Sequence, residues 1–531
     1  MSKEALLFVR PASGLVKTIG TYTVLGTVLG PSINIWWWNF MAILPNIYPG
    51  MRFEAVYAVG GPFVLIEGAA MALVMLSMPR SGNNYVVISR GINPVFGVME
   101  GWRSILQNPI ARGILCFMTG EALGASFVTL GKITANAAVL SLGTAIVMNP
   151  WISVVFGIVM MGIGCLIDYF GPGTTGKWMM FWVVLDVIAL IATIGVFVGV
   201  GPTGLAGAWD RTWGAGAYNE VVKIATTGTP AFTPTPFSWG ATIAALTLPF
   251  GVTYPYTVMP WVGEVTEVEK NIPLACIGGA LILIALHSSA GVAFQYAYGD
   301  FSTMYNHILW TGQSGKFAIN YVIHGTYAMN LGILAAIISG NPALSAFTAI
   351  GPVFGSLSDL PCGIAYTTRP LFALGFDRFA PAIFTKVSKY GSMPYNLAFT
   401  WLYSIPWILA CGTGFLFTEV FSLMIAYFTV RSWMGLVGFS LPWYRPHIYD
   451  TAASIVRKSI FGVPWIAIVG TLEFLWCWYL ALGAAAGSTP ASMLVVIAVY
   501  VFGIVWFIGY SIYNKKKAID TTKIFGEVPP G

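Results

Sequence analysis

The stretch GTVLGPS, residues 26–32, interrupts a long apolar run near the amino terminus with two glycines and a proline. Pro31 has no backbone N–H, and its ring clashes with the carbonyl four residues back, so a helix through this stretch should open locally. Glycine removes the side chain that would otherwise keep a ligand away from opened backbone. A second stretch of this kind, LPFGVTYP at residues 248–255, interrupts a later apolar run. The two stretches predict two helices that are broken within apolar surroundings.

The composition identifies those surroundings as lipid. Of 531 residues, 57% are hydrophobic and only 9% are charged, a balance unlike that of a water-soluble domain. A helix of about 20 residues crosses a hydrocarbon layer of roughly 30 Å, and runs of that length recur without the alternation of barrel strands. The sequence therefore predicts an all-α integral membrane protein. We expect twelve transmembrane helices near residues 15–42, 58–79, 103–133, 149–168, 177–200, 239–260, 273–297, 327–352, 396–415, 418–440, 463–486 and 491–513.

The distribution of Lys and Arg predicts the orientation of these helices. With the amino terminus inside, the inner segments hold most basic residues, including the four tail lysines Lys515, Lys516, Lys517 and Lys523. The outer segments hold Arg52, Arg211, Lys223 and Lys316. Basic segments resist translocation, so both termini should be cytoplasmic, and the net charge of +6 needs no nucleic-acid partner. The amino-terminal residues 1–14 lack the pattern of a cleaved signal peptide, so the first helix should be retained.

The two broken helices suggest an internal repeat within one polytopic domain that spans residues 1–531. If residues 15–200 and 239–440 form inverted repeats of five helices each, the breaks occupy equivalent places in helices one and six. Paired interruptions of this kind point to a transporter binding site near the membrane midplane. Residues 463–513 then supply helices eleven and twelve, and residues 514–531 form a cytoplasmic tail.

Several motifs give the chain a resemblance to the amino acid-polyamine-organocation superfamily. Residues 26–32 resemble the first-helix G-x-x-x-G-S-G pattern, with Pro31 and Ser32 replacing the small residue and the second glycine. Residues 79–85 (PRSGNNY) and 97–102 (GVMEGW) resemble the inner loop between helices two and three. Residues 264–273 resemble the acidic stretch after helix six, and residues 368–381 (TRPLFALGFDRFAP) resemble the motif that follows helix eight.

The resemblance implies a function as well as a fold. It implies two inverted five-helix repeats with broken helices one and six, plus helices eleven and twelve. It also implies alternating access, with amino acids or related amines as substrates. We further expect a plasma-membrane location, and neither enzymatic activity nor a cofactor. The expected substrate-binding residues lie at the two breaks and are Gly26, Gly30, Pro31, Ser32, Phe250, Gly251, Thr253 and Tyr254. The helix that starts after Ser32 would direct partial positive charge at a carboxylate, and the Phe250 and Tyr254 rings would cover an ammonium group.

Carboxylates within the apolar runs are the candidates for coupling to a proton. A charged group inside a membrane is costly, so each one is a functional hypothesis. The coupling candidates are Glu121 and Asp186, with Glu67 as a third whose structural role is favoured; Glu473 is expected to be structural. His287 is expected to be a hydrogen-bonded interior histidine.

Sodium coupling is an alternative to proton coupling. It would use carbonyls of helix one with hydroxyls that we expect in helix eight, namely Ser339, Ser345 and Thr348. Such hydroxyls commonly bond to their own helix backbone, so sodium coupling stays open, and proton coupling is preferred because of the acids within the apolar runs.

A different class of function is a transport-inactive subunit that keeps the fold and holds a larger complex together, because fold alone does not carry function. A membrane enzyme is disfavoured by four scattered histidines. The six cysteines lack paired spacing, so free thiols are expected and no metal site is.

Overall fold

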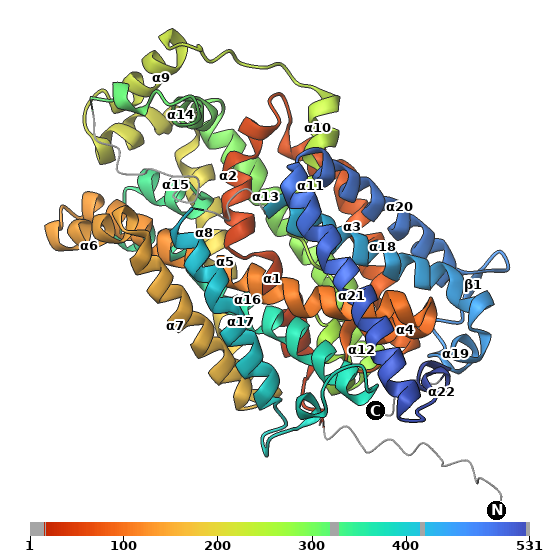
Figure 1. Ribbon diagram of the computed structural model, residues 1–531. Coiled ribbons are helices and arrows are strands. Elements are labelled where there is room, and N and C mark those ends of the chain that lie inside the picture. The colour runs from red at the N-terminus through yellow and green to blue at the C-terminus, as the bar shows by residue number, and fades with distance from the viewer. Residues whose placement is uncertain (1–14, 16, 319–328, 415–419, 527–531) are drawn as a thin grey trace, which may run out of the picture.

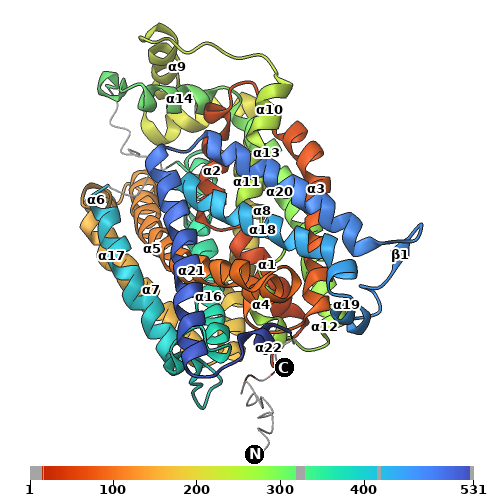
Figure 2. The same cartoon turned by 45° about the vertical axis from the view of Figure 1, so that its right-hand side comes forward.

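The computed structural model describes residues 15, 17–318, 329–414 and 420–526, which form a bundle of helices (Figures 1 and 2). The helical elements in chain order are α1 (Thr21–Ser32), α2 (Ile35–Ile47), α3 (Phe53–Ser77), α4 (Asn83–Gly91), α5 (Pro94–Ile133), α6 (Ala137–Met148), α7 (Pro150–Tyr169), α8 (Pro172–Trp213), α9 (Ala217–Thr227), α10 (Trp239–Ala245), α11 (Thr247–Gly251), η1 (Met259–Glu264), α12 (Val268–Pro273), η2 (Leu274–Gly278), α13 (Gly279–Tyr298), α14 (Phe301–Trp310), η3 (Ser314–Lys316), α15 (Leu331–Ser339), α16 (Pro342–Phe376), η4 (Ala382–Thr385), α17 (Pro394–Gly412), α18 (Val420–Tyr444), α19 (Pro446–Thr451), α20 (Trp465–Ala486), α21 (Pro490–Lys516) and α22 (Thr521–Gly526). A short antiparallel hairpin joins β1 (Ser459–Ile460) to β2 (Val463–Pro464).

In the described part of the chain, nine helical segments are long and apolar enough to cross a membrane. They are α3, α5, α7, α8, the continuous run from α12 to α13, α16, α18, α20 and α21. The chain is therefore an all-helical protein with the composition of a multi-pass membrane protein.

Both predicted interruptions are present. The first helical run divides into α1 and α2 at Ile33 and Asn34, two residues after the predicted opening at Pro31. The sixth divides after α11, and residues 252–258 are non-helical before η1 begins. In Figure 1, α1 and α2 follow one another through the middle of the bundle, with α11 nearby.

The prediction for helix eight was wrong. Residues 327–352 do not form one helix, because α15 ends at Ser339 and α16 begins at Pro342. Asn341 caps α16 by accepting hydrogen bonds from the N–H groups of Ala343 and Leu344, and Pro342 suits the first helical position. The nine residues of α15 are too few to cross a membrane, and the long helix here runs to Phe376. Residues 327 and 328 lie outside the described residues, as do residues 16, 415, 418 and 419 of other predicted helices.

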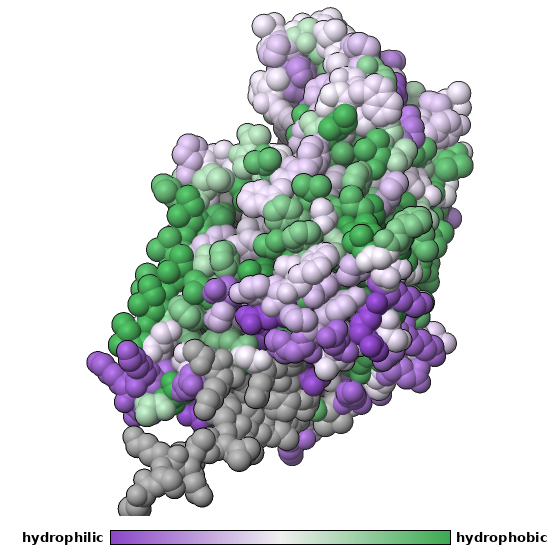
Figure 3. Space-filling model, turned by 90° about the vertical axis from the view of Figure 1, so that its right-hand side faces the viewer, coloured by the Kyte–Doolittle hydropathy of each residue, from purple (hydrophilic) through white to green (hydrophobic). Residues whose placement is uncertain are grey.

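The interior and the surface of the bundle differ as expected for a protein in lipid. Helices α5 and α16 pack against each other in the centre and are largely buried. Helix α21 is apolar but largely exposed, and its large hydrophobic side chains such as Leu494 and Val505 face outward, as does Leu482 of α20. Figure 3 shows apolar side chains across the middle of one face and hydrophilic ones gathered towards its lower end.

Candidate binding site at the helix breaks

Pro31 frees a backbone carbonyl in the first broken helix. In a continuous helix the carbonyl of Thr27 would accept from the N–H of residue 31, which proline lacks. The hydroxyl of Thr257, from the non-helical part of the sixth run, donates to this carbonyl instead. The two breaks are therefore joined directly by a hydrogen bond.

The second half of the broken helix begins with a cap from its own chain. Asn34 Oδ1 accepts from the N–H groups of Trp36 at 3.0 Å and Trp37 at 3.3 Å. The prediction that a helix starting directly after Ser32 offers free N–H groups to a substrate carboxylate is corrected by this geometry, because α2 starts at Ile35 and Asn34 already takes two of those groups.

A buried ion pair lies against this cap. Asn34 Nδ2 donates to Asp359 Oδ2 at 2.9 Å, and Arg112 Nη1 donates to the same oxygen. Arg112 comes from α5 and Asp359 from α16. Asp359 is fully buried, and the Arg112 side chain is 8% exposed. Within the described residues, Asp359 Oδ1 has no hydrogen-bond partner.

Asp186 approaches the same break from α8. Its Oδ1 accepts from Trp38 Nε1 at 3.3 Å, and its Oδ2 has no partner among the described residues. A side-chain carbon at Gly355 of α16 would lie 3.1 Å from Asp186 Oδ2 and 3.1 Å from Asn34 Cα. Gly355 therefore allows α16 to approach the break, and Asp186 lies close to the place where the chain opens.

The sixth run opens in a complementary way. In a continuous helix Tyr254 N–H would donate to Phe250 carbonyl. Here Tyr254 N–H donates to Ser32 Oγ at 2.9 Å, and Arg431 Nη1 from α18 donates to the Phe250 carbonyl at 3.2 Å. Both groups freed by the break thus have partners on other elements.

The other predicted binding residues pack tightly around the breaks. A side-chain carbon at Gly30 would lie 2.9 Å from Ser358 Oγ, and one at Gly26 would collide with Met180. Gly251 faces Phe428 and Met424.

The Phe250 ring and the Thr253 hydroxyl contact neighbouring parts of the protein. The Phe250 ring packs on Tyr57 of α3 and Trp476 of α20, with centroids 5.5 and 5.8 Å away. Thr253 Oγ1 donates to the Pro249 carbonyl at 2.8 Å.

Tyr254 lies in a different environment from Phe250. Its ring is partly buried beside Tyr427, with centroids 6.1 Å apart, and it lies within electrostatic range of both Arg112 and Arg431. Tyr254 is therefore the predicted aromatic residue that the charges of both arginines reach.

The predicted coupling carboxylates do not gather at one place. Asp186 lies at the first break, and Glu67 accepts from Arg431 Nη2 near the second. Glu121 is partly exposed on α5 and lies near Cys411 of α17, away from both. His287 is buried, with its ring stacked on Trp37 at 4.2 Å.

The hydroxyl groups proposed as sodium ligands form hydrogen bonds with one another and with nearby backbone carbonyls of α15 and α16. Ser345 Oγ donates to the Ala336 carbonyl at 2.8 Å, and Thr348 Oγ1 donates to the Leu344 carbonyl at 3.0 Å. Ser339 Oγ lies 2.5 Å from Ser345 Oγ at the junction of α15 and α16.

Sequence reasoning missed Arg112, Asp359 and Arg431. Arg112 and Arg431 fall inside the predicted spans 103–133 and 418–440, so a basic residue within an apolar run was an available signal. Asp359 was missed because helix eight was placed too early. The partners lie 247 and 364 residues apart along the chain, and no local pattern reveals such pairs.

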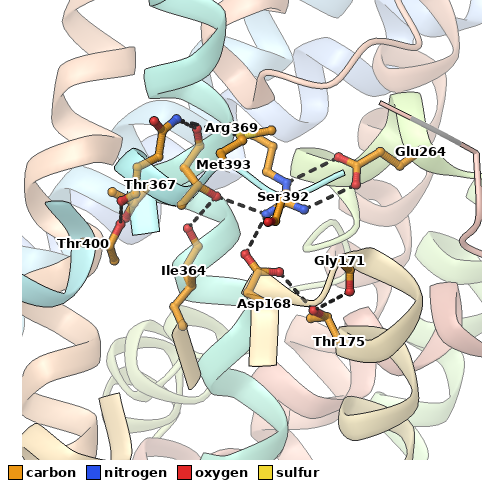
Figure 4. A network of polar contacts seen from close by, with 12 residues as sticks. Asp168, Gly171, Thr175, Glu264, Ile364, Thr367, Arg369, Ser392, Met393 and Thr400 are labelled. Atoms are coloured by element: carbon orange, nitrogen blue, oxygen red, sulfur yellow. Dashed lines mark hydrogen bonds and ion pairs between the residues drawn. The ribbon is translucent and has the colours of Figure 1, made fainter. Parts of the chain in front are cut away.

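A second buried network joins three elements (Figure 4). Arg369, near the end of α16, donates to Asp168 of α7 at 3.1 Å and to Glu264 of η1 at 3.3 Å. Its guanidinium also lies 5.5 Å from the centroid of the Trp261 ring. Burial raises the pKa of the Glu264 carboxyl, and the charge of Arg369 opposes this rise.

Comparison with known proteins gives one similarity over most of the chain. No family profile matches the chain. Over 465 residues, which cover 82% of this chain and 68% of the relative, the sequence is 25% identical to "Amino-acid permease inda1" of Hypocrea atroviridis. The chain is thus a helical protein of membrane composition that is similar, over most of its length, to a protein named as an amino-acid permease.

Proposed function

We propose that this protein is a secondary active transporter that carries amino acids or related small amines by alternating access, coupled to protons. The broken helices, the membrane composition and the similarity to a named amino-acid permease support the transport function. We assign the chain to the amino acid-polyamine-organocation superfamily as part of this proposal.

The buried Arg112–Asp359 pair at the first break is the observation that carries the proposal. An amino acid has a carboxylate and an ammonium group one carbon apart. Arg112 offers donors to the carboxylate, and Asp359 offers an oxygen that lacks a partner among the described residues to the ammonium group. A pair of opposite charges next to opened backbone therefore complements a zwitterion of small size.

The proposed topology has twelve membrane spans, of which the nine long apolar segments supply nine. The two broken runs and α17, which has 19 residues, supply the other three. We propose inverted repeats at residues 15–200 and 239–440, a plasma-membrane location and cytoplasmic termini. The basic residues of the segments on the inner side support this orientation.

Proton coupling is supported by carboxyl groups at both breaks. Asp186 and Glu67 lie where the helices open, and a carboxyl held in a poorly hydrated site can take up and release a proton as access changes sides. The position of Glu121 away from the breaks makes it the weaker candidate of the three.

The test is transport by the purified protein in liposomes. Labelled amino acids and amines are offered as a panel, with an imposed proton gradient, with an imposed sodium gradient, and with neither. We expect uptake that the proton gradient stimulates. Stimulation by sodium alone would remove the proton proposal, and the absence of uptake and exchange across the whole panel would favour a transport-inactive subunit.

A further inference from the structure

The sixth-helix break is held by a cluster of three charged side chains from three helices. The cluster consists of Glu67 on α3, Arg431 on α18 and Glu473 on α20, and each is at most 1% exposed. Arg431 Nη2 donates to Glu67 Oε2, and Glu473 lies within electrostatic range of both side chains. We propose that Glu473 shares the coupled proton with Glu67 in this cluster, an inference that rests on the proposed proton-coupled transport.

Close packing of α18 and α20 brings Glu473 to this place. A side-chain carbon at Gly470 would lie 2.7 Å from the carbonyl oxygen of Gly435, and one at Gly435 would lie 2.6 Å from the N–H nitrogen of Phe474. Glu473 lies one helical turn after Gly470, and Arg431 lies one turn before Gly435. The two glycines therefore set the distance between helices at the level of the cluster.

The charges of the cluster do not balance if both carboxyls are ionised. One guanidinium then faces two carboxylates in a site that is closed to water, which is strongly unfavourable. The other titratable groups acting on the cluster are uncharged in their ordinary forms: Tyr254, Tyr256, Cys276 and Cys477. Two carboxyls around one arginine can share a single proton, and that proton restores balance.

The hydrogen bonds leave room for such a proton. Glu67 Oε1 and Glu473 Oε2 are buried and have no partner among the described residues. Glu473 Oε1 accepts from Cys477 Sγ at 2.9 Å. Each carboxyl therefore keeps one oxygen that can carry the proton.

Arg431 connects the protonation of the cluster to the broken helix. The same guanidinium that pairs with Glu67 donates to the Phe250 carbonyl, the acceptor freed when the helix opens. When the cluster loses its proton, the second carboxylate draws Arg431 more strongly, at the expense of the Phe250 carbonyl. Proton binding and the shape of the break are therefore linked through one side chain.

The test compares two activities of the full-length protein in liposomes. Accumulation of a labelled amino acid against its gradient requires proton coupling, whereas exchange of labelled for unlabelled substrate does not. We expect Glu473→Gln to reduce proton-driven accumulation about 10-fold or more while exchange stays within about 2-fold, since the coupling group alone is removed. Glu473→Asp, which keeps a carboxyl, should restore part of the accumulation. Glu54→Gln, an exposed carboxyl on the same helix as Glu67, is the matched control.

Three outcomes separate the inference from the function on which it rests. Full accumulation by Glu473→Gln would overturn the inference, and so would loss of exchange together with accumulation in a folded variant. A wild-type protein with neither activity would overturn the proposed transport itself. If Glu473→Gln does not fold, infrared spectroscopy of the wild type and of Glu473→Asp decides. We expect a band of a protonated carboxyl whose frequency differs between these two proteins. The absence of such a band would overturn the inference.

Discussion

A buried arginine from another helix lies beside each helix break, but the two arginines have different numbers of carboxyl groups around them. At the first break Arg112 and Asn34 both donate a hydrogen bond to the same oxygen of Asp359. At the second, Arg431 lies among Glu67, Glu473 and the Phe250 carbonyl. A one-to-one pair is suited to receive a ligand that itself carries both charges. Two carboxyls around one arginine are suited to hold a proton. In the function proposed above, the pair beside the first break binds the substrate, and the two carboxyls at the second break, with Asp186 at the first, couple transport to protons.

The largest effect is expected from breaking the one-to-one pair. Arg112→Met leaves the Asp359 carboxylate buried without a counter-ion, which should lower the free energy of unfolding by about 3–5 kcal/mol. Thermal unfolding of the purified protein and uptake in liposomes measure the result. The double variant Arg112→Gln with Asp359→Asn removes both charges, so stability should recover while uptake stays absent. Wild-type thermal stability in Arg112→Met would contradict the role of the pair.

A side chain added at the first break should block uptake more strongly than one added at the second. Gly30→Val meets Ser358 on α16 and Val183 on α8, and we expect loss of uptake and destabilisation of about 1–3 kcal/mol. Gly251→Val meets Phe428 and Met424, and the flexible Met424 can move, so a smaller loss is expected. Membrane insertion and uptake are measured together, with Gly20→Ala as the control because its surroundings are open. Equal uptake by all three variants would show that the breaks do not form the site.

Removing one carboxyl should be tolerated at the second break. Glu67→Gln leaves Arg431 balanced by Glu473, so the free energy of unfolding should fall by at most about 2 kcal/mol. The double variant Glu67→Gln with Glu473→Gln leaves Arg431 unbalanced and should lose about 3–5 kcal/mol. Thermal unfolding of both variants beside Arg112→Met provides the comparison. A loss in Glu67→Gln as large as that in Arg112→Met would show that the two sites have the same balance.

The smallest effect concerns the hydrogen bond that joins the two breaks. Thr257→Val removes the donor to the Thr27 carbonyl and should cost about 1 kcal/mol, since Cys362 Sγ at 3.6 Å still lies against that carbonyl. Thr257→Ser keeps a hydroxyl and should behave as wild type in thermal unfolding. Wild-type thermal stability in Thr257→Val would contradict the role of this hydrogen bond.

Part of this architecture could be predicted because its signals are local. Proline and glycine in residues 26–32 and 248–255 act on the backbone of their own helices, and both helices are broken in the structure. Helix α7 was placed within one residue at each end, from an apolar run between polar flanks. Helix eight was misplaced because α15 and α16 are both apolar and only residues 340–341 separate them. The Asn341–Pro342 start signal was present in the sequence and was outweighed by hydropathy.

The charged groups at the site were harder to predict because they depend on tertiary contacts. The acids Asp186 and Glu67 were found as charges within apolar runs, but their surroundings were set by Trp38 and Arg431 from other helices. The prediction that Glu473 is structural was made without knowledge of Arg431, which the close packing of α18 and α20 brings into electrostatic range. Asn34 was overlooked because its two roles, as a cap for α2 and as a donor to Asp359, appear only when the fold is assembled.

The Arg369 network has a consequence for how its three elements can move apart. Separating α7, η1 and the end of α16 would part Arg369 from Asp168 and Glu264, the ion pairs drawn in Figure 4. Opening hydrates three charges that were buried, and dissolved salt screens charges that reach water. Such a separation should therefore become easier as ionic strength rises, so the contact among these three elements depends on the salt concentration.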